Sequence, residues 1–333
     1  MKNEILRRLS ALALGLALLL NAAPLPQAFA VEDDTDASSS DSADSTDTAD
    51  KTAVTTADND PTVTAAAANA PALDATAALL VSPESDMVLY EKNADEKRYP
   101  ASTTKIMTAL LTLENVSDLS AVVTAEASDF ENVTADSSNA GIKLGEQVTV
   151  KDLLYALMLP SANEAAYMLA RHVGGSWEQF VDMMNERAAE LGCTGTHFCN
   201  PCGLHEDDHY TTAHDLYRIA KQAMKDATFR DIVSTVQHRM AKTNLHEERI
   251  ILTTNQLIFS SFQPWSYANC LGIKTGHTSQ AGNCFVGYAE YGDAKLFSVV
   301  LGCSSSSKEY PTVAASFTDT KSLCQWGFKN FTS

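Results

Sequence analysis

The sequence predicts an α+β protein in which one antiparallel sheet combines strands from both ends of the folded part. Runs of apolar and β-branched residues lie near its start, at 77–81 and 87–91. Three further runs lie within about the last ninety residues, near 270–277, 283–290 and 295–303. The stretch between them carries apolar residues at helical spacing and several helix caps. Strands at both ends therefore favour an antiparallel sheet flanked by helices, with a central helical region.

Residues 1–30 have the organisation of a secretory signal peptide. A basic start is followed by an apolar run at 9–23 and by the small-residue cleavage site Ala28-Phe29-Ala30. The apolar run is short for a membrane-spanning helix, although an uncleaved anchor is an alternative. We expect the mature chain to start at about Val31, outside the cytoplasm. The basic residues of the start are Lys2, Arg7 and Arg8.

Residues 31–72 predict a disordered, acidic linker. They are mainly Asp, Ser, Thr and Ala, and residues 31–60 contain ten acidic residues and one lysine. Such a segment cannot bury enough apolar surface to offset the entropy lost on ordering it, and its like charges repel. It either holds the folded part away from a surface or acts as a solubilising tail. The folded domain is expected at 73–333.

The folded domain is expected to begin with a hairpin and a helix. A turn-rich Ser-Pro-Glu-Ser-Asp separates the runs at 77–81 and 87–91, which predicts a β-hairpin. Pro100 ends an extended segment, and a helix begins at Ser102. The other expected elements are strands at 122–124 and near 147–150, a short apolar run at 250–253, and helices at 150–159, 163–172, 177–191 (capped by Ser176), about 212–224 (capped by Thr212), 227–237 and about 312–331.

Size and charge limit the classes of function. The chain has 333 residues, of which 45% are hydrophobic, so it can form one large domain or two ordinary ones. Its formal net charge is -18. A strongly acidic chain is repelled by phosphate backbones, which argues against nucleic acid as the main partner.

Seven cysteines raise the question of disulfides or a metal site. Because the count is odd, at least one cysteine is free or pairs between chains. The Cys199-Asn-Pro-Cys202 stretch could form a short-loop disulfide in an oxidising compartment. No second CxxC follows it, so we expect no zinc site. The cysteines are Cys193, Cys199, Cys202, Cys270, Cys284, Cys303 and Cys324.

Ser102 and Lys105 form a Ser-x-x-Lys pair at the predicted helix start. Side chains at i and i+3 share one helix face, so the lysine amine can reach the serine hydroxyl. A serine hydroxyl is a weak nucleophile unless a base takes its proton, and a lysine can be that base if burial and nearby positive charge lower its pKa. The helix start also offers free N–H groups for a developing oxyanion. An isolated pair is equally typical of an N-cap serine and a solvated lysine, so partners elsewhere in the chain are needed.

Two later stretches supply candidate partners. Ser161 and Asn163 lie in a loop between two predicted helices, where a hydroxyl and an amide can point into a cleft. Lys274 and Thr275 lie on a predicted strand, where lysine, threonine and backbone N–H groups can receive a carboxylate and pair with an extended peptide. Gly276 on the same strand lets a ligand approach the backbone closely.

The three motifs together resemble the penicillin-interacting serine enzymes. Ser-x-x-Lys is followed 59 residues later by Ser-x-Asn and 113 residues after that by Lys-Thr-Gly. The surrounding stretches resemble one family in particular, the D-alanyl-D-alanine carboxypeptidases of low molecular mass (peptidase S11). They are Tyr99-Pro-Ala-Ser-Thr-Thr-Lys-Ile-Met-Thr, Leu153-Leu-Tyr-Ala-Leu-Met-Leu-Pro-Ser-Ala-Asn, His209-Tyr-Thr-Thr-Ala-His-Asp-Leu and Gly272-Ile-Lys-Thr-Gly-His-Thr-Ser-Gln-Ala-Gly. The resemblance covers about residues 73–331 and implies a β-lactamase/transpeptidase-like fold.

The resemblance implies catalytic roles for four residues. Ser102 would attack the carbonyl between the two D-Ala residues that end a peptidoglycan stem peptide, and Lys105 would accept its proton. Ser161 would relay a proton to the departing D-Ala amine. Asn163 would orient the substrate amide and the lysine. A water would then hydrolyse the acyl-enzyme, so that one D-Ala is removed during cell-wall biogenesis without a metal or another cofactor.

The resemblance also implies a substrate-binding strand. Lys274 and Thr275 would bind the terminal carboxylate, and Gly276 and His277 would line the same strand. The backbone N–H groups of Ser102 and His277 would form the oxyanion hole. We expect Lys274 to lower the pKa of Lys105 as well, because the two cations would be close. β-Lactams resemble the substrate and would acylate Ser102.

Several expectations follow for partners and for other side chains. The family works outside the cytoplasm, at the cell wall or the outer face of the membrane. Many members continue into a second domain and a membrane anchor, whereas this sequence ends at Ser333, which leaves membrane association open. His205, His209 and His214 lie near three aspartates, and the resemblance implies a structural loop there rather than a metal site.

Two alternative functions stay open. A serine β-lactamase would use the same nucleophile but needs rapid deacylation, and the sequence has no Glu-x-x-x-Asn signature in a suitable loop between Ser161 and Lys274. A non-catalytic peptidoglycan-binding module would keep the fold without the chemistry. The intact Ser102 and Lys105 argue against the second alternative.

Overall fold

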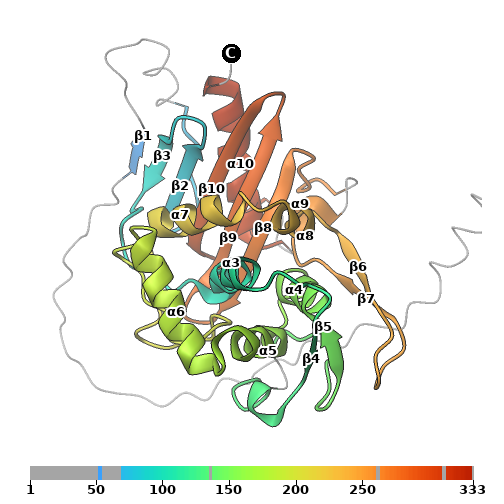
Figure 1. Cartoon of the computed structure of the whole chain (residues 1–333). Coiled ribbons are helices and arrows are strands. Elements are labelled where there is room, and N and C mark those ends of the chain that lie inside the picture. Colours follow the sequence, from blue (N-terminus) through green and yellow to red (C-terminus); the bar gives the residue numbers. More distant parts are fainter. Residues whose placement is uncertain (1–51, 55–68, 135–136, 260–262, 310–312, 332–333) are drawn as a thin grey trace, which may run out of the picture. The chain divides into compact units, whose positions relative to one another are not determined.

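An antiparallel sheet of six strands organises the described part of the chain and confirms the predicted α+β class (Figure 1). Its order is β1-β3-β2-β10-β9-β8, so the N-terminal hairpin joins the C-terminal strands as predicted. The register of the junction pairs Leu79 with Val299. The strands are β1 (Thr52–Val54), β2 (Ala77–Ser82), β3 (Met87–Lys92), β8 (Cys270–Thr278), β9 (Gly282–Tyr291) and β10 (Ala294–Cys303).

This structure is a computed structural model, and it describes residues 52–54, 69–134, 137–259, 263–309 and 313–331. All of them belong to one compact unit, Ala49–Ser333. The predicted signal peptide, residues 1–30, and most of the predicted linker lie outside the described residues. Among the described helices, none is both long and apolar enough to cross a membrane.

Strand β1 corrects the prediction of a structureless segment over 31–72. Thr52 pairs with Lys92 and Val54 pairs with Tyr90, so these three residues extend the sheet beyond β3. The edge of β3 presents backbone N–H and C=O groups that a further strand can satisfy without burying large side chains. Apolar content, on which the linker prediction rested, does not report this kind of pairing.

The helices agree with the prediction for most of the chain. Ser176 and Thr212 cap their helices as expected, with side chains that accept hydrogen bonds from the N–H groups of Gln179 and Asp215. The helix expected at Ser102 begins as a 3-10 turn, Ala101–Thr104. The α-helices are α3 (Lys105–Asn115), α4 (Val150–Met158), α5 (Asn163–Gly174), α6 (Trp177–Glu190), α7 (Ala213–Ala223), α8 (Ala227–Val233), α9 (Gln256–Phe259) and α10 (Ala315–Phe331).

The predicted helix at 227–237 is too long. It ends at Val233, where the hydroxyls of Ser234 and Thr235 donate to the carbonyls of Arg230 and Asp231 and so compete with further helical turns. The chain then forms a separate two-stranded ribbon that the sequence did not predict as a hairpin. Its strands are β6 (Gln237–Met240) and β7 (Arg249–Leu252), and the predicted strands at β4 (Val122–Thr124) and β5 (Gln147–Thr149) form a second ribbon.

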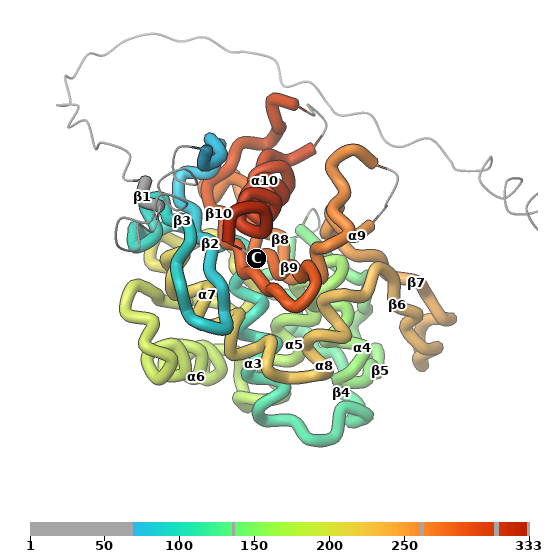
Figure 2. Tube along the Cα trace, turned by 90° about the horizontal axis from the view of Figure 1, so that it is seen from above, coloured from blue at the N-terminus to red at the C-terminus, as the bar shows by residue number. Residues whose placement is uncertain are grey.

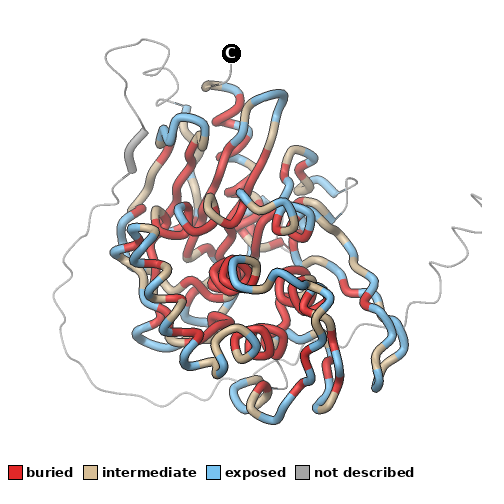
Figure 3. The backbone as a smooth tube through the Cα atoms, viewed as in Figure 1, coloured by how far each residue is buried: buried red, intermediate tan, exposed pale blue. Residues whose placement is uncertain are grey.

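Helices cover both faces of the large sheet. Helix α10 packs on one face, and α7 and α8 pack on the other, as the view from above makes clear (Figure 2). Helix α5 contacts α3, α4 and α6 in the helical region. The buried residues concentrate on the strands and the central helices (Figure 3). The edge strand β8 also packs against the turn at Ala101–Thr104, which leads into α3 of the helical region.

Close packing between α10 and the sheet depends on a glycine. A Cβ atom on Gly327 would lie 2.7 Å from a methyl carbon of Leu80 and 2.9 Å from one of Leu296. Leu80 is fully buried in the cluster that joins these two elements. The Leu80 side chain thus occupies the space that a side chain at position 327 would need. The contact is close-packed, as is usual in a protein interior.

We expect Leu80→Ala to lower the free energy of unfolding by about 2–5 kcal/mol, because it leaves a cavity between the sheet and α10. Leu144 is 62% exposed and is the matched control. Leu144→Ala should change stability by less than about 0.5 kcal/mol. Urea unfolding followed by circular dichroism measures both variants, and equal small losses would contradict the packing described here.

Candidate active site

Ser102 lies in the 3-10 turn that leads directly into α3, and Lys105 is the first residue of that helix. Because the turn and the helix are continuous, the two side chains share one face. The predicted contact forms: Lys105 Nζ donates to Ser102 Oγ at 2.9 Å. Lys105 is fully buried, whereas Ser102 is partly exposed and lines a cavity.

The amine of Lys105 has two further acceptors. Lys105 Nζ donates to Asn163 Oδ1 at 2.7 Å and to the backbone carbonyl of Cys202 at 2.7 Å. An ammonium group has three donors, and here each has a partner. If the amine loses one proton, the two acceptors other than Ser102 can keep its remaining hydrogens. Its lone pair then faces the hydroxyl of Ser102, which is the geometry that a general base requires.

Burial changes the protonation of both lysines. Burial lowers the pKa of Lys105 to about 8, against the opposing influence of Cys202 and Glu164. Burial and the charge of Lys105 together hold the pKa of Lys274 well below its ordinary value. Burial and nearby positive charge were both expected to lower the pKa of Lys105. In the structure burial is the main cause for both lysines, and repulsion between them adds to the lowered pKa of Lys274.

Ser161 and Asn163 occupy the loop and first turn of α5, as predicted. Ser161 has a φ of 65°, a conformation that few non-glycine residues adopt. Its hydroxyl is buried and has no hydrogen-bond partner among the described residues. Asn163 donates its backbone N–H to the carbonyl of Ser138 at 2.8 Å. The loop thus presents one unpaired hydroxyl and one amide beside the lysine.

Strand β8 forms the opposite wall. Among the described strands it pairs with β9 alone, so its other edge can accept an extended ligand. A Cβ atom on Gly276 would lie 3.1 Å from the backbone nitrogen of Ser102, so the strand runs directly beside the nucleophile. Lys274 is 1% exposed, and its Nζ donates to the carbonyl of Thr275 at 3.1 Å.

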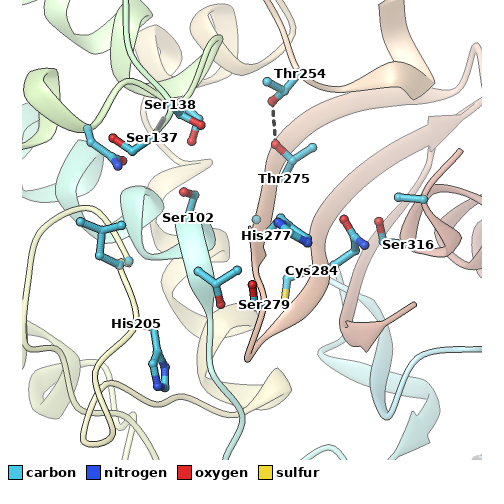
Figure 4. A pocket seen from close by; sticks show the side chains of 18 of the residues that line it. Ser102, Ser137, Ser138, His205, Thr254, Thr275, His277, Ser279, Cys284 and Ser316 are labelled. Atoms are coloured by element: carbon cyan, nitrogen blue, oxygen red, sulfur yellow. Dashed lines mark hydrogen bonds between the residues drawn. The ribbon is translucent and has the colours of Figure 1, made fainter. Parts of the chain in front are cut away.

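The two walls enclose a cavity of about 640 Å³. Ser102 points into it between Ser137 and Ser138 on one side and Thr275 and His277 on the other (Figure 4). Ser161, Asn163 and Gly276 line the same cavity, whereas Lys105 and Lys274 lie buried behind its surface. No Asp, Glu, Lys or Arg side chain lines the described part of the cavity.

Several contributors escaped the sequence reasoning. The hydrogen bond from Lys105 to the Cys202 carbonyl could not be predicted. It depends only on where the backbone lies, and no pattern of side chains in the sequence indicates that position. Asn200 holds that carbonyl in place by accepting hydrogen bonds from the N–H groups of Cys202 and Gly203. Thr254 also lines the cavity, where its hydroxyl lies 2.6 Å from the hydroxyl of Thr275 (Figure 4).

His209 supports the loop that carries Cys202. The N–H of Cys199 donates to His209 Nδ1 at 3.1 Å, so the ring proton is on Nε2, which lies 2.8 Å from Thr104 Oγ1. Burial lowers the pKa of His209 to about 3, so the ring is neutral at physiological pH. Within the described residues no group of His, Cys, Asp and Glu could hold a metal ion. All seven cysteines are free thiols, so the short-loop disulfide is not formed.

Comparison with known proteins shows to which family the chain belongs. The family model of peptidase S11, described as D-alanyl-D-alanine carboxypeptidase, matches residues 64–305, which is more than half of the chain. The chain belongs to the peptidase S11 family. Each motif that the sequence singled out lies within the matched range, and the relatives below share that family's name.

Curated relatives match most of this chain. D-alanyl-D-alanine carboxypeptidase DacF of Bacillus subtilis is 34% identical over 233 residues, which are 70% of this chain and 58% of that protein. The D-alanyl-D-alanine carboxypeptidase of Streptomyces sp. (strain K15) is 35% identical over 253 residues, 72% of this chain and 82% of that protein. The match thus spans little more than half the length of the Bacillus relative.

Solved structures confirm the predicted β-lactamase/transpeptidase-like fold. The crystal structure of the Streptomyces K15 DD-transpeptidase is similar to this chain with a TM-score of 0.70 and 33% sequence identity. The similarity covers 78% of this chain and 99% of that one. A penicillin-binding protein homologue from Mycobacterium tuberculosis is similar with a TM-score of 0.70 at 30% identity, over 79% of this chain and 95% of that one.

We expect Gly203→Ala to destabilise the protein strongly. Gly203 has a φ of 86°, and a Cβ atom there would lie 1.9 Å from the carbonyl oxygen of Ala101. Gly145 has a φ of 81° with nothing within 4 Å of a Cβ atom, so Gly145→Ala isolates the backbone cost of about 1–2 kcal/mol. Thermal unfolding should show a clearly larger loss for Gly203→Ala, and equal losses would mean that the loop is not pressed against the serine turn.

Proposed function

We propose that this protein is a serine-type D-Ala-D-Ala carboxypeptidase that removes the terminal D-Ala from peptidoglycan stem peptides. The observation that carries the proposal is the buried amine of Lys105, held 2.9 Å from Ser102 Oγ by Asn163 and the Cys202 carbonyl. An amine with a pKa near 8 is a competent base near neutral pH. Membership of the S11 family supports the substrate class.

Acylation begins at Ser102. Its Oγ attacks the carbonyl carbon of the penultimate D-Ala, and Lys105 Nζ takes the hydroxyl proton as the C–O bond forms. The backbone N–H groups of Ser102 and His277 stabilise the oxyanion of the tetrahedral intermediate. The C–N bond then breaks, and Ser161 passes a proton from Lys105 to the departing amine. The unpaired hydroxyl of Ser161 suits this relay because no other described residue competes for it.

The terminal carboxylate is bound at β8. Thr275 presents its hydroxyl to the cavity, and Thr254 adds a second hydroxyl 2.6 Å away. Lys274 is buried behind Thr275 and contributes positive charge through it when protonated. The free edge of β8, with Gly276 and His277, pairs with the extended peptide. The described cavity lining holds no Lys or Arg side chain. Hydroxyl groups, rather than exposed cations, therefore contact the carboxylate of the substrate.

Deacylation completes the cycle. A water attacks the ester carbonyl, Lys105 accepts a proton from that water, and Ser102 regains its proton as the C–O bond breaks. The products are the shortened stem peptide and free D-Ala. We infer that the reaction takes place outside the cytoplasm, where peptidoglycan is located, and that β-lactams acylate the same Ser102 and leave it slowly.

We expect Ser102→Ala to abolish both D-Ala release from a stem pentapeptide and covalent labelling by fluorescent penicillin, because both need the same Oγ. Ser120→Ala, at an exposed loop serine that lies outside the cavity lining, is the control and should keep both signals. An unmodified protein that gave neither signal would refute the proposal. Rapid loss of the label with release of hydrolysed antibiotic would instead indicate a serine β-lactamase.

The second-order rate of penicillin labelling should rise from about pH 6, reach half of its maximum near pH 8 and level off about one to two pH units higher, because only the neutral amine of Lys105 can accept a proton. Below the pKa of Lys105 its lone pair is protonated, so the rate falls as the pH falls. Stopped-flow labelling at constant ionic strength measures this profile. A rate that is constant across this range, or that still rises near about pH 10, would exclude Lys105 as a base with a pKa near 8.

A further inference from the structure

Glu164 is a buried carboxylate beside the active site that the proposed mechanism does not use. It follows Asn163 in the first turn of α5 and is 1% exposed. Acidic side chains are almost never buried unless they are paired, because the loss of hydration is costly. The contacts of Glu164 therefore indicate what it does.

One oxygen of Glu164 holds a wall of the cavity. Glu164 Oε1 accepts hydrogen bonds from the backbone N–H groups of Ala140 at 2.7 Å and Ile142 at 3.4 Å. The Asn163 N–H binds the same segment through the carbonyl of Ser138. Ser137 and Ser138 line the cavity on the side that faces β8 (Figure 4). The first turn of α5 thus fixes the position of this wall relative to Ser102.

The second oxygen of Glu164 takes no part in the hydrogen bonds to the wall. Oε2 is buried and has no hydrogen-bond partner in the described part of the chain. Burial raises the pKa of Glu164, whereas the N–H groups of Ala140 and Ile142 and the charge of Lys105 act in the opposite direction. When Glu164 is ionised, its charge raises the pKa of Lys105. A hydrogen bond is therefore not the only link between Glu164 and the site.

We propose that Glu164 is a positioning residue with two tasks: its hydrogen bonds hold the wall at 137–142 where the stem peptide passes, and its charge adjusts the basicity of Lys105. The proposal rests on the proposed function, since both tasks concern the same reaction. It adds a residue that the Ser-x-x-Lys, Ser-x-Asn and Lys-Thr-Gly motifs do not contain.

The charged and titratable groups around Lys105 come from four elements. Glu164 approaches from α5 and Cys202 from its loop, and both favour the protonated amine. Lys274 approaches from β8 and repels it. His209 is neutral at physiological pH because burial lowers its pKa to about 3. Among the described carboxylates, Glu164 is the one whose charge acts on Lys105.

Two substitutions separate the two tasks. Glu164→Gln keeps an oxygen that can accept from Ala140 and Ile142 but removes the charge. Glu164→Ala removes both. Glu186, an exposed glutamate on α6, supplies the matched controls Glu186→Gln and Glu186→Ala. Thermal unfolding of all variants shows which of them are folded, and only folded variants enter the kinetic comparison.

For Glu164→Gln, we expect the pH profile of penicillin labelling to shift to lower pH, because the protonated amine of Lys105 loses a favourable charge. The KM for D-Ala release from a stem pentapeptide should change by less than about twofold, since the wall keeps its acceptor. For Glu164→Ala, the same profile shift should be joined by a rise in KM of roughly tenfold, which corresponds to losing about 1.4 kcal/mol of hydrogen bonding. Both Glu186 variants should match the unmodified protein.

The outcomes are distinct. An unmodified protein without D-Ala release or labelling would refute the proposed function itself. With an active unmodified protein, an unshifted pH profile in Glu164→Gln would refute the electrostatic task. An unchanged KM in a folded Glu164→Ala variant would refute the positioning task. If Glu164→Ala is unfolded, the profile and KM of Glu164→Gln still test the charge, and Glu164→Leu, which keeps the volume without an acceptor, tests the wall.

Discussion

The burial of one amine, Lys105 Nζ, is the constraint on which the site depends. A charged amine without exposure to water is costly unless each of its donors has an acceptor. Here Ser102, Asn163 and the Cys202 carbonyl supply three acceptors. Burial also lowers the pKa of the amine to about 8, so the proton is held weakly enough to be exchanged. Burial of the Lys105 amine therefore has two effects: it costs free energy of hydration, and it gives the amine the lowered pKa that a general base needs.

The fold brings these acceptors together from distant parts of the sequence. The serine turn is packed against β8, where Gly276 leaves no side chain between the strand and the nitrogen of Ser102. Gly203 allows the loop of Cys202 to press against the same turn. Both glycines are required because backbones meet there. Strand β8 and the first turn of α5 supply lining residues on opposite walls of the cavity, and Glu164 joins α5 to the wall at 137–142.

Much of this arrangement was predictable because it depends on local patterns. The caps at Ser176 and Thr212, the strands at both ends and the i, i+3 spacing of Ser102 and Lys105 all follow from short-range rules. The Cys202 carbonyl and the hydroxyl of Thr254 were not predictable, because their roles depend on which backbone segments meet in three dimensions. Strand β1 and the β6–β7 ribbon were missed since pairing, rather than composition, orders them. Burial was one of the two causes expected to lower the pKa of Lys105, but its weight relative to repulsion from Lys274 could not be read from a motif.

Lys105 is a buried amine that should lose its proton near neutral pH. Nuclear magnetic resonance titration of protein labelled with carbon-13 at the lysine ε-carbon tests this directly, with Lys105→Arg used to assign the signal. The Lys105 signal should titrate with a pKa near 8, apart from the exposed lysines. A Lys105 signal that titrates with the exposed lysines, near their ordinary pKa of about 10.4, would contradict it.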